Sequence, residues 1–150
     1  MRRAAVLLTP ALLAPVAGAT VVRPLSLGEQ VKKAEVIVQA RVADVKDAQQ
    51  GGFAWKVYPL TVTETVVGDA SALPRYENAP ALWVLAGVDG APTFAKGDEA
   101  VLLLYKSLYD SPLVGFNQGV YRIKNGKIEG QSVSDVAAFK KSLVSLRGAK

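Results

Sequence analysis

The chain has 150 residues, of which 50% are hydrophobic and 21% are charged, a composition that fits one compact domain and excludes a disordered chain. It contains no cysteine and no histidine, which excludes disulfides, Ser-His-Asp and Cys-His catalysis, and the common zinc sites. The formal net charge is +5. Six of the basic residues are scattered singly, namely Arg41, Lys56, Arg75, Lys96, Lys106 and Arg122, whereas a nucleic-acid binder usually concentrates its positive charge in one patch.

The N-terminal segment, residues 1–19, has the pattern of a secretory signal peptide. Arg2 and Arg3 give a basic start, an apolar run follows, and Ala17-Gly18-Ala19 matches the small-x-small pattern of a cleavage site. The run is shorter than the roughly 18 to 20 apolar residues that a membrane span needs, and two prolines interrupt it. We therefore expect a periplasmic or secreted protein, with a single domain over residues 20–150 and no membrane span after cleavage.

A helix is expected at each end of this domain. Ser26 and Glu29 form a capping box, which predicts a short helix that runs to about Ala34. Residues 135–146 repeat apolar side chains at helical spacing, and the resulting stripe consists of Val136, Phe139, Leu143 and Leu146. We expect this C-terminal amphipathic helix to pack on the strand at 101–105, which carries apolar residues on both of its faces.

Between the helices, the sequence predicts short strands separated by glycine turns. The predicted strands cover residues 36–45, 54–67, 82–86, 101–105, 113–123 and 127–129, and Asn125-Gly126 gives a type I′ hairpin signal before the last. In the second strand, Tyr58, Leu60, Val62 and Val66 are expected to face the core. Trp55 and three threonines then occupy the solvent face, and Pro59 indicates an edge or a bulge.

This arrangement predicts a mainly β fold. Short strands with glycines at the corners favour a small antiparallel OB-like barrel with a short N-terminal helix and the C-terminal helix described above. A two-sheet β-sandwich uses the same alternation of apolar and polar residues and is the alternative.

Three segments resemble a known group of proteins. They are Leu25-Ser26-Leu27 with residues 34–42, Phe94-x-x-Gly97-Asp98-Glu99 before an aliphatic strand, and residues 115–123. They are similar to uncharacterised exported bacterial proteins, which resemble the OB-like barrel of netrin-like and tissue-inhibitor-of-metalloproteinase modules. The resemblance implies this fold over most of the mature chain. Those inhibitors chelate zinc through an N-terminal cysteine, whereas the mature chain here would begin at Thr20, so the resemblance does not imply protease inhibition.

Exposed aromatic residues are the candidate binding residues: Trp55, Tyr76, Tyr109 and Phe116. They lie near predicted turns or on the strand face opposite the core, and OB-like barrels bind extended ligands across such a face. The alternative is that these rings close the ends of the barrel. No residue is predicted to be catalytic or to bind a cofactor or a metal, and the adjacent acids Asp98 and Glu99 are expected to cap a turn.

The expected function is that of an exported, non-enzymatic binding or interaction module for a protein, peptide or glycan. Trp55→Ala would then remove ligand affinity and leave the fold nearly intact. One alternative is a small hydrolase that uses carboxylates or a serine with a lysine, such as Ser107 with Lys106 or Ser142 with Lys141. Another is an extracytoplasmic oligonucleotide binder, but a row of threonines without lysine or arginine argues against nucleic acid.

Overall fold

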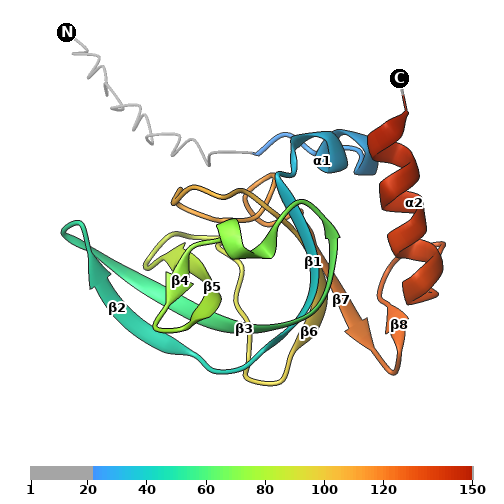
Figure 1. The fold of residues 1–150 in the computed structure, drawn as a ribbon. Coiled ribbons are helices and arrows are strands. Elements are labelled where there is room, and N and C mark those ends of the chain that lie inside the picture. The colour runs from blue at the N-terminus through green and yellow to red at the C-terminus, as the bar shows by residue number, and fades with distance from the viewer. Residues whose placement is uncertain (1–21, 150) are drawn as a thin grey trace, which may run out of the picture.

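The computed structural model describes residues 22–149, which form one bent antiparallel sheet with a helix near each end (Figure 1). The strands are β1 (Val36–Val42), β2 (Lys46–Gln50), β3 (Phe53–Val67), β4 (Arg75–Tyr76), β5 (Ala79–Leu85), β6 (Glu99–Leu104), β7 (Val120–Lys124) and β8 (Lys127–Ile128). The helices are α1 (Leu27–Lys33), α2 (Val136–Gly148) and the short 3-10 helix η1 (Ala70–Ala72). The prediction of a mainly β, antiparallel fold with two terminal helices is confirmed.

Neither α1 nor α2 is a membrane span: within residues 22–149, no helix is long and apolar enough to cross a membrane. The predicted signal peptide, residues 1–19, lies outside the described residues.

The sheet is open, and β3 carries its bend. Its strand order is β4-β5-β3-β1-β6-β7-β8, with β2 on β3, and the end strands β4 and β8 do not pair with each other in the described part of the chain. The first half of β3 pairs with β2 and β5, whereas the second half pairs with β1. Pro59 lies between the halves, where a residue that has no N–H fits best. Pro59 pairs in register with Ala81 of β5 in an interior strand, so the edge or bulge predicted at Pro59 is not seen, and the proline lies instead where β3 changes partner.

The bend also explains an error in the predicted first strand. We expected one strand over residues 36–45, but β1 ends at Val42 and β2 begins at Lys46. The amide of Ala43 donates to the carbonyl of Pro59 at 2.8 Å, and this bond holds the chain as it passes from one half of β3 to the other. Continuous alternation in the sequence hides this break, because it depends on the partner strand.

Apolar side chains fill both faces of the sheet. The first core cluster contains Val36, Val38, Ala40 and Val42 of β1, together with Tyr58, Leu60, Leu82, Leu102 and Leu104. The second lies between the sheet and the helices, and contains Ile37, Val101, Leu103, Tyr121, Val31, Phe139 and Leu143. Strand β6 is therefore buried on both faces, and Val101 and Leu103 of its outer face share the second core cluster with Phe139 and Leu143 of α2.

Side-chain caps fix the two helices. The hydroxyl of Ser26 accepts from the Glu29 amide at 3.2 Å, and the Glu29 carboxylate accepts from the Ser26 amide at 2.8 Å. The predicted capping box is confirmed, and the bond from the Ser26 amide lowers the pKa of Glu29. At the other end of α1, Arg147 of α2 donates to the carbonyls of Val31 and Ala34 at 2.9 and 2.7 Å, which joins the two helices.

Irregular pairing changes the face that the end of β3 presents. The register between β1 and β3 shifts twice, between Ile37 and Val38 and between Gln39 and Ala40. Because an extra residue turns the following side chains to the opposite face, Val62 packs in the first core but Val66 packs in the second. The prediction that Val66 shares the core face of Tyr58 is therefore wrong.

Candidate functional site

The four candidate aromatic residues separate into two groups, and the first consists of the buried Trp55 and the partly buried Tyr76. Trp55 and Tyr76 both pack against Trp83, with ring centroids 6.1 Å apart in each pair. Trp55 is only 8% exposed, and its indole N–H donates to the carbonyl of Gln50 at 3.0 Å. Trp55, Trp83 and the fully buried Val57 belong to a third core cluster, on the face of β3 and β5 opposite the first. The expectation that Trp55 lies in solvent is wrong.

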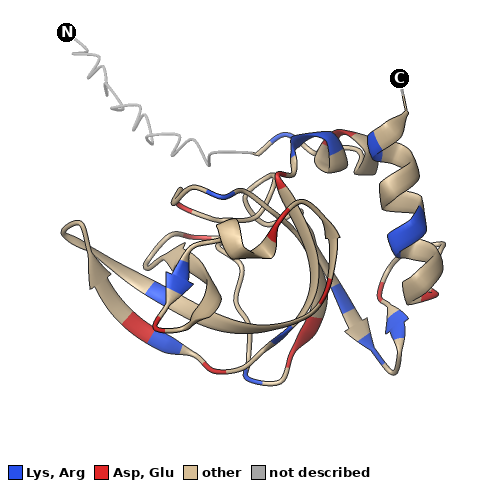
Figure 2. Cartoon of the chain, in the orientation of Figure 1, with Lys and Arg blue, Asp and Glu red and all other residues tan. Residues whose placement is uncertain are grey.

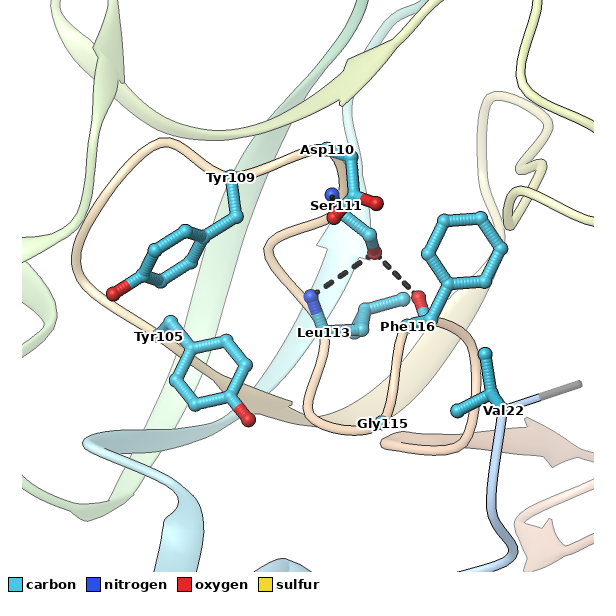
Figure 3. Close-up of a pocket in the computed structure, with 8 residues that line it drawn as sticks. All are labelled: Val22, Tyr105, Tyr109, Asp110, Ser111, Leu113, Gly115 and Phe116. Carbon is cyan, nitrogen blue, oxygen red and sulfur yellow. Dashed lines mark hydrogen bonds between the residues drawn. The ribbon is translucent and has the colours of Figure 1, made fainter. Parts of the chain in front are cut away.

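Tyr109 and Phe116, by contrast, come together at one surface site. They line an open hollow of about 470 Å³ on the loops between β6 and β7, which we call the aromatic hollow (Figure 3). Its lining consists of Val22, Tyr105, Tyr109, Asp110, Ser111, Leu113, Gly115 and Phe116. Tyr109 is 52% exposed. The structure thus brings two of the four predicted residues together, with neighbours that the sequence did not suggest.

Two backbone turns build the aromatic hollow. The amide of Tyr105 donates to the carbonyl of Pro112 at 2.9 Å, which closes the first loop. The amide of Phe116 donates to the carbonyl of Leu113 at 3.1 Å, which closes the second. Gly115 and Phe116 both have left-handed backbones, with φ of 65° and 69°. Glycine takes this conformation freely, but phenylalanine is strained there, so the turn holds the Phe116 ring at the rim against a local preference.

Ser111 fixes this turn from inside. It is 2% exposed, and its hydroxyl donates to the carbonyl of Phe116 at 2.5 Å and accepts from the amide of Leu113 at 3.2 Å. The carboxylate of the preceding Asp110 accepts from the Ser111 amide at 2.8 Å. The Ser111 hydroxyl is committed to backbone groups, so its role is to position Phe116.

The walls of the aromatic hollow are rings. Tyr105 and Tyr109 meet edge to face, with centroids 5.4 Å apart and an interplanar angle of 83°. In Figure 3 the two tyrosines lie on one side of the hollow, Phe116 and Val22 lie on the other, and Asp110 lies between them. Such a site offers aromatic surface from more than one direction, together with one carboxylate.

Gln118 ties the N-terminal segment to the same loops. Its side-chain oxygen accepts from the amide of Leu25 at 2.7 Å, and its side-chain nitrogen donates to the carbonyls of Arg23 and Gly115 at 3.0 and 3.2 Å. These bonds hold the segment that carries Val22 against the aromatic hollow. Sequence reasoning missed Gln118, because a single glutamine in a loop belongs to no pattern.

We expect Gln118→Ala to loosen this segment without unfolding the domain. The Leu25 amide would lose its hydrogen bond to the Gln118 side chain. Such a bond is worth about 1 kcal/mol, so hydrogen exchange at this amide should become about fivefold faster or more. Exchange measured by NMR tests this, with Gln49→Ala as the matched control, because Gln49 is exposed on β2. Unchanged exchange at Leu25 would show that Gln118 does not hold the segment in solution.

The aromatic hollow continues into a strip across the surface. Val22 and Phe116 also line a second hollow, which shares Gly90 and Asn117 with a third that reaches Arg122. The side chain of Asn117 donates to the carbonyl of Gly90 at 3.1 Å, so the loops on the two sides of the strip are joined. The candidate site therefore extends beyond the aromatic hollow along these shared residues.

The other candidate groups have structural partners. Asp98 accepts from the Ala95 amide at 2.8 Å and pairs with Arg122 at 3.2 Å, so its predicted role in capping the turn is confirmed. Glu99 instead pairs with Arg41 at 2.8 Å. The hydroxyl of Ser142 donates to a carbonyl within α2 at 2.6 Å. Among residues 22–149, no group of three or more acids lies close enough to hold a metal ion.

Charges of both signs are spread over the elements (Figure 2). Ion pairs such as Lys56 with Asp47 and Lys124 with Glu129 lie at the surface, where each contributes little to stability. Over residues 22–149, lysines and arginines lie on several separate elements, whereas nucleic-acid affinity mostly depends on positive charge concentrated in one patch.

A comparison with known protein families and with curated proteins finds no match for this chain. A fold alone does not define a function, because function depends on the chemistry of a site. The candidate site is the aromatic hollow together with its strip, because two of the predicted binding residues, Tyr109 and Phe116, meet there.

Proposed function

We propose that this protein is an exported, non-enzymatic binding module whose partner docks at the aromatic hollow. The observation that carries the proposal is an aromatic surface that the core does not need. Tyr109 is 52% exposed, and Phe116 is held at the rim by a strained left-handed backbone. Exposed aromatic surface marks interaction sites, because rings supply large contact area at low cost in side-chain entropy.

The partner that fits best is a peptide, a protein segment or a glycan. The strip that continues from the aromatic hollow through Phe116 and Asn117 suits an extended chain. Lysine and arginine do not line the aromatic hollow, so a phosphate backbone finds no counter-charge there. A hydrolase with Ser111 as its nucleophile has no support, since that hydroxyl is buried and bonded to the backbone.

Immobilised peptide and glycan arrays probed with the purified protein test the proposal. Tyr109→Ala should lower the affinity for any bound probe by about tenfold or more, as removal of an aromatic anchor commonly does. Its melting temperature should change little, because the ring is half exposed. Phe53→Ala is the matched control, since Phe53 is an aromatic residue 59% exposed on β3, outside the aromatic hollow.

Two results would contradict the proposal. Equal binding by Tyr109→Ala and the unmodified protein would place the binding surface elsewhere. Binding only to oligonucleotides, with affinity that falls steeply as salt rises, would favour the nucleic-acid alternative.

A further inference from the structure

We infer that the aromatic hollow takes a cationic side chain, and that the partner is an extended peptide which carries an arginine or lysine. This inference rests on the proposed function of the aromatic hollow, and it adds the chemistry of the ligand. Three observations support it: the arrangement of the rings, an uncompensated carboxylate, and the continuation of the site into a strip.

The rings form the kind of surface that attracts cations. An ammonium or guanidinium group within about 6 Å of a ring centroid is drawn to the negative face of the ring. Tyr105 and Tyr109 meet at 83°, so they form two walls at nearly a right angle. Phe116 forms a third wall on the opposite side (Figure 3). A cation in the aromatic hollow therefore meets ring surface on more than one side.

Asp110 supplies the matching charge. One of its carboxylate oxygens accepts from the Ser111 amide, and within residues 22–149 it belongs to none of the ion pairs. Lysine and arginine are missing from the lining of the aromatic hollow, although the whole chain has a formal charge of +5. A neutral apolar group placed here would desolvate this carboxylate without compensation, whereas a cation would pair with it.

A sugar fits the lining less well. Carbohydrates present many hydroxyl groups, and a site that orients them needs several free polar partners. The Ser111 hydroxyl is occupied by Phe116 and Leu113, so Asp110 and the two tyrosine hydroxyls are the polar side-chain groups left in the lining. This set favours one charged group over an array of neutral hydroxyls.

The strip favours a peptide over a small free amine as the source of the cation. Phe116 and Val22 belong to both the aromatic hollow and the next one along, so a chain anchored by its side chain has surface on which to continue. A small free cation would leave that surface unused. We therefore assign the cation to a peptide side chain.

Paired probes of nearly equal shape test this inference. A blocked pentapeptide with a central arginine is compared with the same peptide carrying citrulline, the neutral isostere of arginine, and with tetramethylammonium ion. NMR titration follows the signals of Tyr109 and Phe116. We expect the arginine peptide to bind at least about fivefold more tightly than the citrulline peptide, because the free energy of one cation–aromatic contact corresponds to a difference in affinity of about this size.

Two charge-neutralising variants complete the design. Asp110→Asn keeps an oxygen that can accept from the Ser111 amide, and it should weaken binding of the arginine peptide while leaving binding of the citrulline peptide unchanged. Glu77→Gln removes the same charge from an exposed residue outside the aromatic hollow and should leave binding unchanged. Denaturation midpoints of both variants should match that of the unmodified protein.

Each contrary result has a distinct meaning. Equal binding of the two peptides, unaffected by Asp110→Asn, would overturn the cation and keep the aromatic hollow as a binding site. Tetramethylammonium bound as tightly as the arginine peptide would overturn the peptide as the source of the cation. No shift at Tyr109 or Phe116 with any of these probes would overturn the cationic ligand, and the array experiment then decides the proposed function separately.

Discussion

Trp55→Ala is expected to lower the free energy of unfolding by about 3 to 5 kcal/mol, the usual cost of removing a large buried ring. Trp55 is 8% exposed, packs edge to face on Trp83 at 6.1 Å, and donates a hydrogen bond to Gln50. Both helices pack on the second core cluster, so neither is placed to move into the space that the ring leaves. Urea denaturation measures the effect.

The matched control for this change is Phe53→Ala. Phe53 lies two positions before Trp55 in β3, on the same side of the strand, but it is 59% exposed. Its loss should change stability by less than about 0.5 kcal/mol, as for other surface substitutions. A loss below about 1 kcal/mol for Trp55→Ala would show that the ring is open to solvent, and would restore the sequence hypothesis of a binding face on β3.

The sequence predicted those parts of the fold whose causes are local. The capping box at Ser26 and Glu29 involves groups three residues apart, and the apolar stripe of α2 follows from helical spacing alone. Strand β6 was recognisable because both of its faces are apolar, which requires cover on both sides. The turn at Asn125 and Gly126 has positive φ at both residues, as its sequence predicted.

Errors arose where a distant segment decides the outcome. Alternation assigned Trp55 to the solvent face of its strand, but Trp83 comes from β5, and only the pairing of β3 with β5 reveals that the two rings cover each other. Val66 changed faces because β3 carries extra residues relative to β1. A bulge has no signature in one strand, since it is a mismatch between two.

In the candidate site, too, the features with local causes could be predicted and those that depend on distant segments could not. Tyr109 and Phe116 stood out in the sequence because aromatic residues in loops need an explanation. Their assembly with Tyr105 and Asp110 could not be predicted, because it depends on the Ser111 hydroxyl and on a left-handed turn at Phe116. A serine between an aspartate and a proline resembles any turn, and its burial is evident only once the loops are folded.

Leu103→Ala is expected to lower the free energy of unfolding by about 2 to 5 kcal/mol, because it opens a cavity in a fully buried part of β6. The surroundings cannot collapse easily. The backbone of Leu103 donates to the carbonyl of Gly119 at 2.9 Å and accepts from the amide of Val114 at 3.0 Å. On the other side it pairs with Ile37 of β1, and the chain has no disulfide to compensate.

This substitution also tests the link between the core and the aromatic hollow, because the turn that carries Phe116 lies between Val114 and Gly119, which Leu103 anchors. We expect Leu103→Ala to shift the NMR signals of Phe116. The control is Leu108→Ala, at a residue 38% exposed in the loop after β6, which should lower the free energy of unfolding by less than about 1 kcal/mol. Denaturant melts of both variants measure the two losses of stability. A loss below about 1 kcal/mol at Leu103 would mean that β6 is partly open, and α2 could not then cover its outer face.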